Sequence, residues 1–207
     1  MNRWKKFTAP RWPVPAGRTG WLGLLWVFFA AYSGAQTVQW TTNFYPVTGA
    51  DFRDIRRSME TTRPWPEPFD GDTRWTLTWK FNFHETAVGC TLASFSTTTI
   101  ITTTLPRWTP PPDVRPETKE RWTRYYTNLL AHETGHARLA LAAAAEVRQR
   151  LGEASAQANC DQLRTLLNDR ANRVVENYRA REKEYDRRTD HGRNSESGPP
   201  RGPGPGR

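Results

Sequence analysis

The sequence of 207 residues predicts an α+β fold, in which a small antiparallel sheet packs on a long two-helix hairpin. Three observations lead to this prediction. Residues 73–83 alternate apolar and polar side chains, as a half-buried strand does. Residues 117–134 contain neither Gly nor Pro and carry apolar residues at three- and four-residue steps. Residues 156–187 repeat this helical spacing after a short break.

The first half of the chain is predicted to supply the sheet and one short helix. Residues 37–47 are rich in β-forming side chains and alternate loosely, which indicates a strand. Residues 50–61 place apolar side chains at helical spacing, and three prolines between residues 64 and 68 then favour an extended connection. After the strand at 73–83, the Thr-rich segment 90–105 predicts another strand or a bent pair of strands.

The second half is predicted to form the two long helices. Pro116 suits the first turn of a helix, and Gly152 is expected to end it. If the two helices fold back around residues 152–155, residues 174–178 of the second helix lie opposite the middle of the first.

Five residues within the first long helix, from His132 to His136, read H-E-x-x-H. Residues four apart lie on one face of a helix, so His132 and His136 can bind one metal ion while Glu133 reaches a water beside it. Zinc proteases use this arrangement of two ligands and a general base. The alternative is a pair of core histidines with ordinary hydrogen bonds. Gly135 lowers helix stability relative to Ala, and close packing against the backbone would explain it.

A catalytic zinc normally has three protein ligands and one position for water, so a third ligand is needed. His191 is our first choice and Asp186 the alternative, since His and Asp are common zinc ligands. Both lie beyond the predicted fold-back level, so the chain after Tyr185 would have to turn toward the metal. Asp190 and Gly192 allow such a turn. Further candidates are Glu176, Glu182 and His84.

The two ends of the chain are predicted to lie outside the folded domain. Residues 1–35 have a basic start, an apolar stretch at 21–32 and small residues before Gln36, which is typical of a secretory signal peptide. An uncleaved N-terminal anchor is the alternative, and no stable membrane span is expected after cleavage. Residues 192–207 are rich in Gly and Pro and are predicted to be disordered. The predicted destination is the periplasm or the medium, and the oligomeric state stays open.

The formal net charge of +9 points at first to nucleic acid. Most of this charge lies in the predicted signal and tail, which leaves no strong basic surface in the folded domain, so nucleic acid is not an expected partner. The only two cysteines, Cys90 and Cys160, are expected to form one disulfide after export. A cysteine metal site is the weaker alternative because the C-x-x-C spacing is absent.

Several motifs occur in an order that resembles one bacterial family. They are Tyr45-x-Val47-x-Gly49, Trp75 and Trp79, Gly89-Cys90, Leu105-Pro106-Arg107-Trp108, Trp122 with the H-E-x-x-H, Cys160, and Tyr185-Asp186-x-x-Thr189-x-His191-Gly192. The chain resembles the proteins grouped as domain of unknown function 922 (DUF922), regarded as secreted zinc-dependent proteases, over residues 45–191. The resemblance implies that Cys90 pairs with Cys160 and that residues 185–192 belong to the site. After Gly192 this chain departs from the small-residue segment of the family.

The expected function is that of a zinc metallopeptidase domain over residues 36–191. Zn²⁺ would be the cofactor and a peptide or protein the substrate, with Glu133 as the general base. Candidate donors to the oxyanion are Tyr185, Tyr126 and Arg107. The strand around Ile100 is expected to offer an edge to an extended peptide. The alternatives are a non-enzymatic envelope protein with a structural or vestigial metal site, and a zinc amidase acting on cell-wall peptides.

Overall fold

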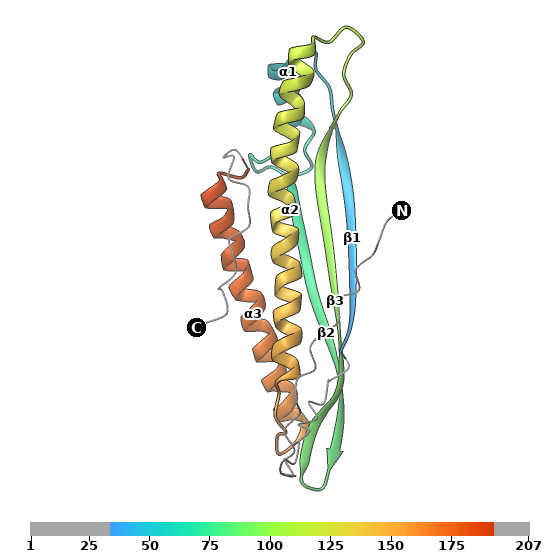
Figure 1. The fold of residues 1–207 in the computed structure, drawn as a ribbon, viewed down its shortest axis with the longest axis vertical. Helices are drawn as coiled ribbons and strands as arrows, with labels where there is room; N and C mark the ends of the chain where they lie inside the picture. Colours follow the sequence, from blue (N-terminus) through green and yellow to red (C-terminus); the bar gives the residue numbers. More distant parts are fainter. Residues whose placement is uncertain (1–33, 193–207) are drawn as a thin grey trace, which may run out of the picture. The chain divides into compact units, whose positions relative to one another are not determined.

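The computed structural model describes residues 34–192, so the predicted signal before residue 34 and the predicted tail after residue 192 lie outside the described residues. The predicted α+β class and the order of the elements are confirmed. In chain order the elements are β1 (Gly34–Val47), α1 (Phe52–Thr62), β2 (Asp72–Thr86), β3 (Gly89–Trp108), α2 (Pro116–Gly152) and α3 (Cys160–Thr189) (Figure 1).

The sheet is mixed, and the prediction of an antiparallel sheet is wrong for β1. The strand order is β1-β3-β2. β2 and β3 form an antiparallel hairpin, whereas β1 runs parallel to β3. The physical reason is a double reversal of the chain: α1 returns it to the end of the sheet where β1 finished, and the hairpin then reverses it again. Alternation of side chains shows which face of a strand is buried but not which strand is its neighbour.

β3 is the central strand, so the expectation that the segment around Ile100 offers a free edge is also wrong. Ile100 lies opposite Gln39 of β1 on one side and opposite Thr76 of β2 on the other. The two edges of the sheet belong to β1 and β2.

The main core lies between the sheet and the two long helices. α2 contacts β2, β3 and α3, and α3 also contacts the two strands (Figure 1). Small side chains on α2 let the helix approach closely, and its fully buried alanines are Ala137, Ala140, Ala143 and Ala144. The buried side of α3 follows the predicted stripe from Leu163 to Tyr185. The helices within residues 34–192 are too short or too polar to cross a membrane.

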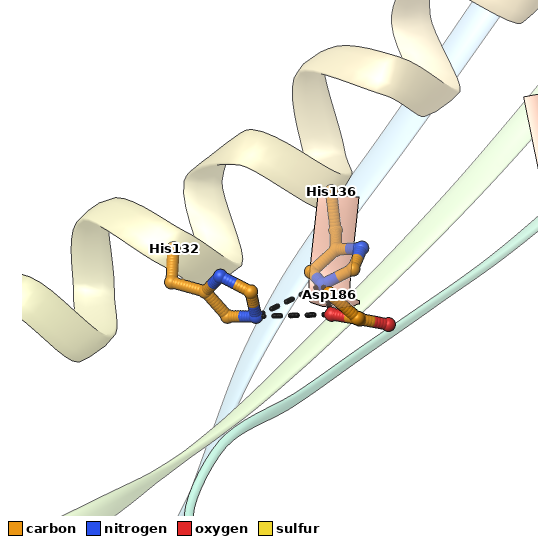
Figure 2. Close-up of side chains that lie close together, drawn as sticks. All are labelled: His132, His136 and Asp186. Atoms are coloured by element: carbon orange, nitrogen blue, oxygen red, sulfur yellow. Dashed lines mark hydrogen bonds and ion pairs between the residues drawn. The ribbon is translucent and has the colours of Figure 1, made fainter. Parts of the chain in front are cut away.

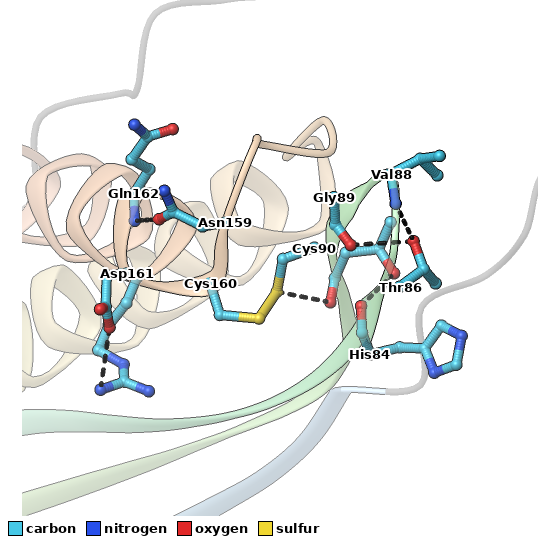
Figure 3. Close-up of a disulfide and its surroundings, with 11 residues drawn as sticks. His84, Thr86, Val88, Gly89, Cys90, Asn159, Cys160, Asp161 and Gln162 are labelled. Atoms are coloured by element: carbon cyan, nitrogen blue, oxygen red, sulfur yellow. Dashed lines mark hydrogen bonds and ion pairs between the residues drawn. A yellow bond between two sulfur atoms is a disulfide. The ribbon is translucent and has the colours of Figure 1, made fainter.

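The connection between α2 and α3 is longer than predicted, and this moves the register of the hairpin. Gln157 forms a two-way backbone bridge with Cys90, with N···O distances of 2.9 and 3.0 Å. Cys90 and Cys160 form the expected disulfide at the start of α3 (Figure 3). Residues 153–159 are therefore held against β3 in a non-helical path, and α3 begins only at Cys160. As a result, residues beyond the predicted 174–178 lie opposite the middle of α2.

A second, smaller cluster fixes the segment that leads into β2. It includes Tyr45, Ile55 and Met59, which join β1 to α1. The Tyr45 hydroxyl donates to the backbone oxygen of Asp70 at 2.7 Å, and the Tyr125 hydroxyl donates to its carboxylate at 2.6 Å. These contacts hold Asp70 between β1 and α2, and they place the next residue, Gly71, beside the H-E-x-x-H.

Candidate metal centre

The centre of α2 and the C-terminal part of α3 bring two imidazoles and a carboxylate together. His132, His136 and Asp186 form a group whose ligand atoms all lie within 4.8 Å of one another. The His132 Nε2 atom lies 3.2 Å from His136 Nε2 and 3.2 Å from Asp186 Oδ1, and His136 Nε2 lies 2.9 Å from the same Oδ1. Figure 2 shows the two rings on one face of α2 with Asp186 opposite them. The three atoms form a nearly equilateral triangle.

This triangle fits a tetrahedral metal ion. Bonds of about 2.0–2.1 Å at tetrahedral angles separate neighbouring ligand atoms by about 3.3 Å. The observed edges of 2.9–3.2 Å are slightly shorter, so a small outward movement of the side chains would accommodate an ion. Two imidazoles and one carboxylate are also a donor set found at catalytic zinc sites, which leave the fourth position open.

The ring of His132 is oriented by Thr189 and Tyr185. The Thr189 hydroxyl donates to the backbone oxygen of Tyr185 at 2.8 Å, so its oxygen accepts from His132 Nδ1 at 3.1 Å. With the proton on Nδ1, the Nε2 lone pair of His132 points into the triangle. The Tyr185 ring stacks on the imidazole with centroids 4.9 Å apart. Both contacts keep His132 in a ligand orientation.

The ring of His136 is oriented by Glu182. The carboxylate Oε1 of Glu182 lies 3.6 Å from His136 Nδ1 and accepts from the Trp75 indole at 2.6 Å. Its other oxygen accepts from the Arg179 guanidinium at 2.9 Å. Glu182 is thus fixed from β2 and from α3, and it favours the Nδ1 proton on His136. Carboxylates in this position commonly orient the histidine ligands of metals.

The charges around the triangle favour a bound proton. Burial alone would lower the pKa of His136, but contacts with Asp186 and Glu182 outweigh it and raise that pKa to about 10. Burial alone would raise the pKa of Asp186, but hydrogen bonds from His132 and His136 hold it well below its usual range. Without a metal the group therefore keeps a proton between the carboxylate and an imidazole. A metal ion would displace this proton.

Glu133 lies next to the triangle with its carboxylate buried and only partly satisfied. Its side chain is 3% exposed, and its Oε2 atom has no hydrogen-bond partner among the described residues. Burial raises the pKa of Glu133 to about 7. Gly71 packs against this carboxylate so closely that an added Cβ would lie 2.6 Å from Oε1. A buried acceptor with a spare lone pair and a pKa near neutrality can accept a proton from a water.

A cavity of about 490 Å³ connects these groups. One wall is the beginning of β2, another is the H-E-x-x-H of α2, and the third is the C-terminal half of α3. The residues of these walls that matter for the chemistry are Gly71, Thr73, His132, Glu133, His136 and Asp186. The size lies within the range of small-molecule and peptide sites.

The predicted third ligands are placed differently by the fold. Asp186, the alternative choice, completes the triangle, whereas His191, the first choice, lies beside it with Nδ1 3.7 Å from Asp186 Oδ1. The His191 ring stacks on Phe69, with centroids 5.8 Å apart. The expected turn after α3 is present, because Asp190 and His191 have positive φ angles of 47° and 50°. Of the remaining candidates, Glu182 lines the cavity, while Glu176 and His84 do not.

The fold does not bring the three predicted oxyanion donors to the cavity. The Tyr185 hydroxyl donates to the backbone oxygen of His132 at 3.3 Å, on the helix side of the ring. Tyr126 stacks on Trp122, and the Arg107 guanidinium lies over the Phe44 ring. None of the three belongs to the cavity wall.

The supporting roles of three residues could not be read from the sequence. Thr189 and Trp75 stand in the family motifs, and no pattern marks Arg179; all three hold the ligands through contacts between distant segments. Gly135 carried a usable signal, since a glycine within a helix indicated close packing. An added Cβ there would lie 2.2 Å from the Tyr185 hydroxyl, which confirms the expectation.

Comparison with known proteins gives a family but no described relative. No curated protein and no solved structure matches the chain. The family model described as "Bacterial protein of unknown function (DUF922)" matches residues 42–192. This match begins within β1, spans every later element of the fold through α3, and includes the triangle and Glu133. The chain therefore belongs to the DUF922 family of bacterial proteins of unknown function.

Proposed function

We propose that this protein is an exported zinc-dependent peptidase with its active site in the cavity between β2, α2 and α3. One observation carries the proposal. The ligand triangle of His132, His136 and Asp186 shares a cavity with the buried, incompletely bonded carboxylate of Glu133. A site that only stabilises the fold needs ligands but has no use for a spare acceptor beside them.

In amide hydrolysis the metal site and Glu133 would have separate roles. Zinc, when bound, supplies the charge that acidifies a water and polarises a carbonyl. Glu133 accepts one proton of the water as the water oxygen attacks the carbonyl carbon. The C–N bond then breaks, and Glu133 returns the proton to the leaving amine. A pKa of about 7 for Glu133 suits a group that must both accept and release a proton near neutral pH.

Export is part of the proposal because of the disulfide. Cys90 and Cys160 are bonded across 70 residues of sequence, and such bonds persist in oxidising compartments. The predicted signal peptide supports the same destination, either the periplasm or the medium.

A second candidate is a non-enzymatic envelope protein whose metal only stabilises the fold. The position of His191 favours this candidate. The Nδ1 atom of His191 lies 3.7 Å from Asp186 Oδ1, so a small rotation of the His191 side chain would bring a fourth ligand to the ion. Four protein ligands would leave no place for a reacting water.

The test compares Glu133→Gln with Glu120→Gln, an exposed substitution on the same helix. Each mature protein is loaded with zinc, its metal content is measured, and cleavage of fluorescein-labelled casein is followed. We expect equal zinc in all proteins, and a loss of at least about 100-fold in cleavage for Glu133→Gln alone. Equal cleavage of casein by wild type and Glu133→Gln would overturn the proposal that the protein is a peptidase. Full zinc occupancy without any cleavage by the wild type would favour the structural site.

A further inference from the structure

We propose that the cavity holds its substrate as an extended peptide, whose main chain pairs with Gly71 and with the outer edge of β2 from Asp72 to Thr76. This inference rests on the proposed function and names the form in which the substrate binds. Pairing of this kind needs several consecutive peptide units, so the site would select unfolded segments and flexible loops of proteins.

The first support is the position of β2 in the sheet. Its inner side pairs with β3, which already has β1 on its other side, so the outer side of β2 pairs with no strand of residues 34–192. Gly71 to Thr76, at the beginning of this edge, also form one wall of the cavity that contains the triangle. A strand edge beside a catalytic cavity offers backbone donors and acceptors to an incoming chain.

The second support is the direction of the backbone groups. The Trp75 carbonyl accepts from the Arg179 guanidinium of α3 at 2.5 Å, so it faces α3. Along an antiparallel strand the groups that face outward recur at every second residue. Thr73 therefore shares the orientation of Trp75. The side-chain contact of Thr73 with Thr103 at 3.2 Å agrees, because opposed residues that exchange no hydrogen bonds bring their side chains close. Since Arg179 already occupies the Trp75 carbonyl, the edge offers the peptide the Thr73 backbone groups and the Trp75 amide.

The third support is the distance between this edge and the chemical groups. The Thr73 hydroxyl donates to the backbone oxygen of Glu133 at 3.4 Å, and Gly71 touches the Glu133 carboxylate. A peptide lying along Gly71 to Thr73 would therefore pass directly beside the general base. The α3 wall, with Lys183 and Asp186, would face the other side of the peptide.

The main test uses peptides that cannot be cleaved and that bind zinc at one end. A mixed-sequence pool of pentapeptide hydroxamates is screened against the zinc-loaded protein, and the tightest member is N-methylated at one residue at a time. N-methylation removes one backbone donor and leaves the side chain unchanged. We expect Kd to rise about fivefold or more at alternate residues and less than about twofold at the residues between them. If N-methylation raises Kd at residues that do not alternate along the peptide, the inference is overturned.

Amide exchange followed by NMR provides a second readout that needs no substitution in the protein. On binding of the same hydroxamate, we expect slower exchange at the Thr73 and Trp75 amides. The Arg74 amide, which pairs with β3, and the amides of the opposite edge strand β1 serve as internal controls and should not change. Slower exchange of the β1 amides on binding, or unchanged exchange of the Thr73 amide, would overturn the inference.

The outcomes also separate this inference from the proposed function. Binding and casein cleavage without alternation or protection at β2 would leave the peptidase standing and remove only the mode of binding. Failure of every hydroxamate to bind the zinc-loaded protein would overturn both.

Discussion

At the scale of single residues, the site depends on side chains that are held by others. Thr189 favours a proton on Nδ1 of His132, and Glu182 favours one on Nδ1 of His136. Both Nε2 atoms therefore point to the carboxylate of Asp186. Glu133 differs from them, because one of its oxygens is buried and has no hydrogen-bond partner within residues 34–192. The proposed peptidase rests on this contrast between satisfied ligands and an unsatisfied acceptor.

The first prediction concerns the third ligand. Asp186→Ala should weaken zinc affinity by more than about 100-fold, because it removes one corner of the triangle. His191→Ala should change the affinity by less than about threefold, since His191 lies beside the triangle. Competition with a chromogenic chelator measures both affinities. If His191→Ala loses zinc while Asp186→Ala keeps it, the assignment of the ligands must be exchanged.

The second prediction concerns the pH dependence of stability in the metal-free protein. The pKa of Glu133 rises from its ordinary value of 4.5 to about 7 in the fold, so the folded state binds a proton more tightly than the unfolded chain does. The contribution of Glu133 to stability is therefore present below pH 4.5 and is lost as the pH rises to about 7. The full loss is on the order of 3 kcal/mol.

Glu133→Gln should abolish this dependence. In chelated protein at pH 8, urea unfolding should find the Gln variant more stable than wild type by a few kcal/mol, and the difference should vanish near pH 4. Glu120→Gln, on the exposed side of α2, should change the free energy of unfolding by less than about 0.5 kcal/mol at either pH. A constant difference between wild type and Glu133→Gln across the pH range would contradict the burial of the charge.

At the scale of elements, the hairpin of α2 and α3 decides which residues meet. The buried side of α3 continues from Leu163 through Tyr178 to Tyr185 without a change in spacing, so one stripe serves both the core and the site. Tyr185 fits because α2 has no side chain at Gly135, and the ring lies there against the His132 imidazole. At the level of the site, the close approach of the two helices therefore depends on Gly135.

The third prediction tests this contact with two glycines of the same helix. Gly135→Ala would place a Cβ 2.2 Å from the Tyr185 hydroxyl, and it should lower the free energy of unfolding by about 1–3 kcal/mol. Gly152→Ala meets no atom within 4 Å and should be neutral, or stabilising by up to about 1 kcal/mol. Urea titration of both variants measures the difference. Equal effects would mean that Tyr185 does not pack on α2 as described.

At the scale of residues 34–192 as a whole, the sheet and the helices meet at two ends. At one end Asp70 ties β1, α1 and α2 together and holds Gly71 against Glu133. At the other end the disulfide and the backbone bridge of Gln157 tie β3 to the start of α3. The second set of contacts determines where α3 begins, and hence that Asp186 reaches the histidines.

The fourth prediction follows from this arrangement. Replacing both Cys90 and Cys160 with Ala should lower the free energy of unfolding by about 4 kcal/mol, because the bond closes a loop of 70 residues. Zinc affinity should fall as well, since α3 loses its anchor at the far end from the ligands. Reduction of the wild type should give the same two changes. Unchanged zinc affinity in the reduced protein would show that the register of α3 is set without the disulfide.

Much of the fold and part of the site could be predicted from local patterns. The alternation in β2, the apolar stripe of α2 and the H-E-x-x-H depend on periods of two and about four residues, which any stretch of sequence displays by itself. The third ligand could only be narrowed to a segment. The expected fold-back around residues 152–155 placed residues 174–178 opposite the motif, whereas Glu182, Tyr185 and Asp186 take these places.

By itself, the sequence determined the elements, the class of the fold, and the two histidines and glutamate of the motif, because these follow from the backbone period of a helix or strand. Only the tertiary structure decided that β1 is parallel to β3, that Asp186 completes the triangle, and that one oxygen of Glu133 has no partner in the part of the chain that the structure describes. The physical reason is that pairing, register and desolvation arise between segments far apart in the chain. The few residues around Gln157, held by β3, shift a whole helix and so select the ligand.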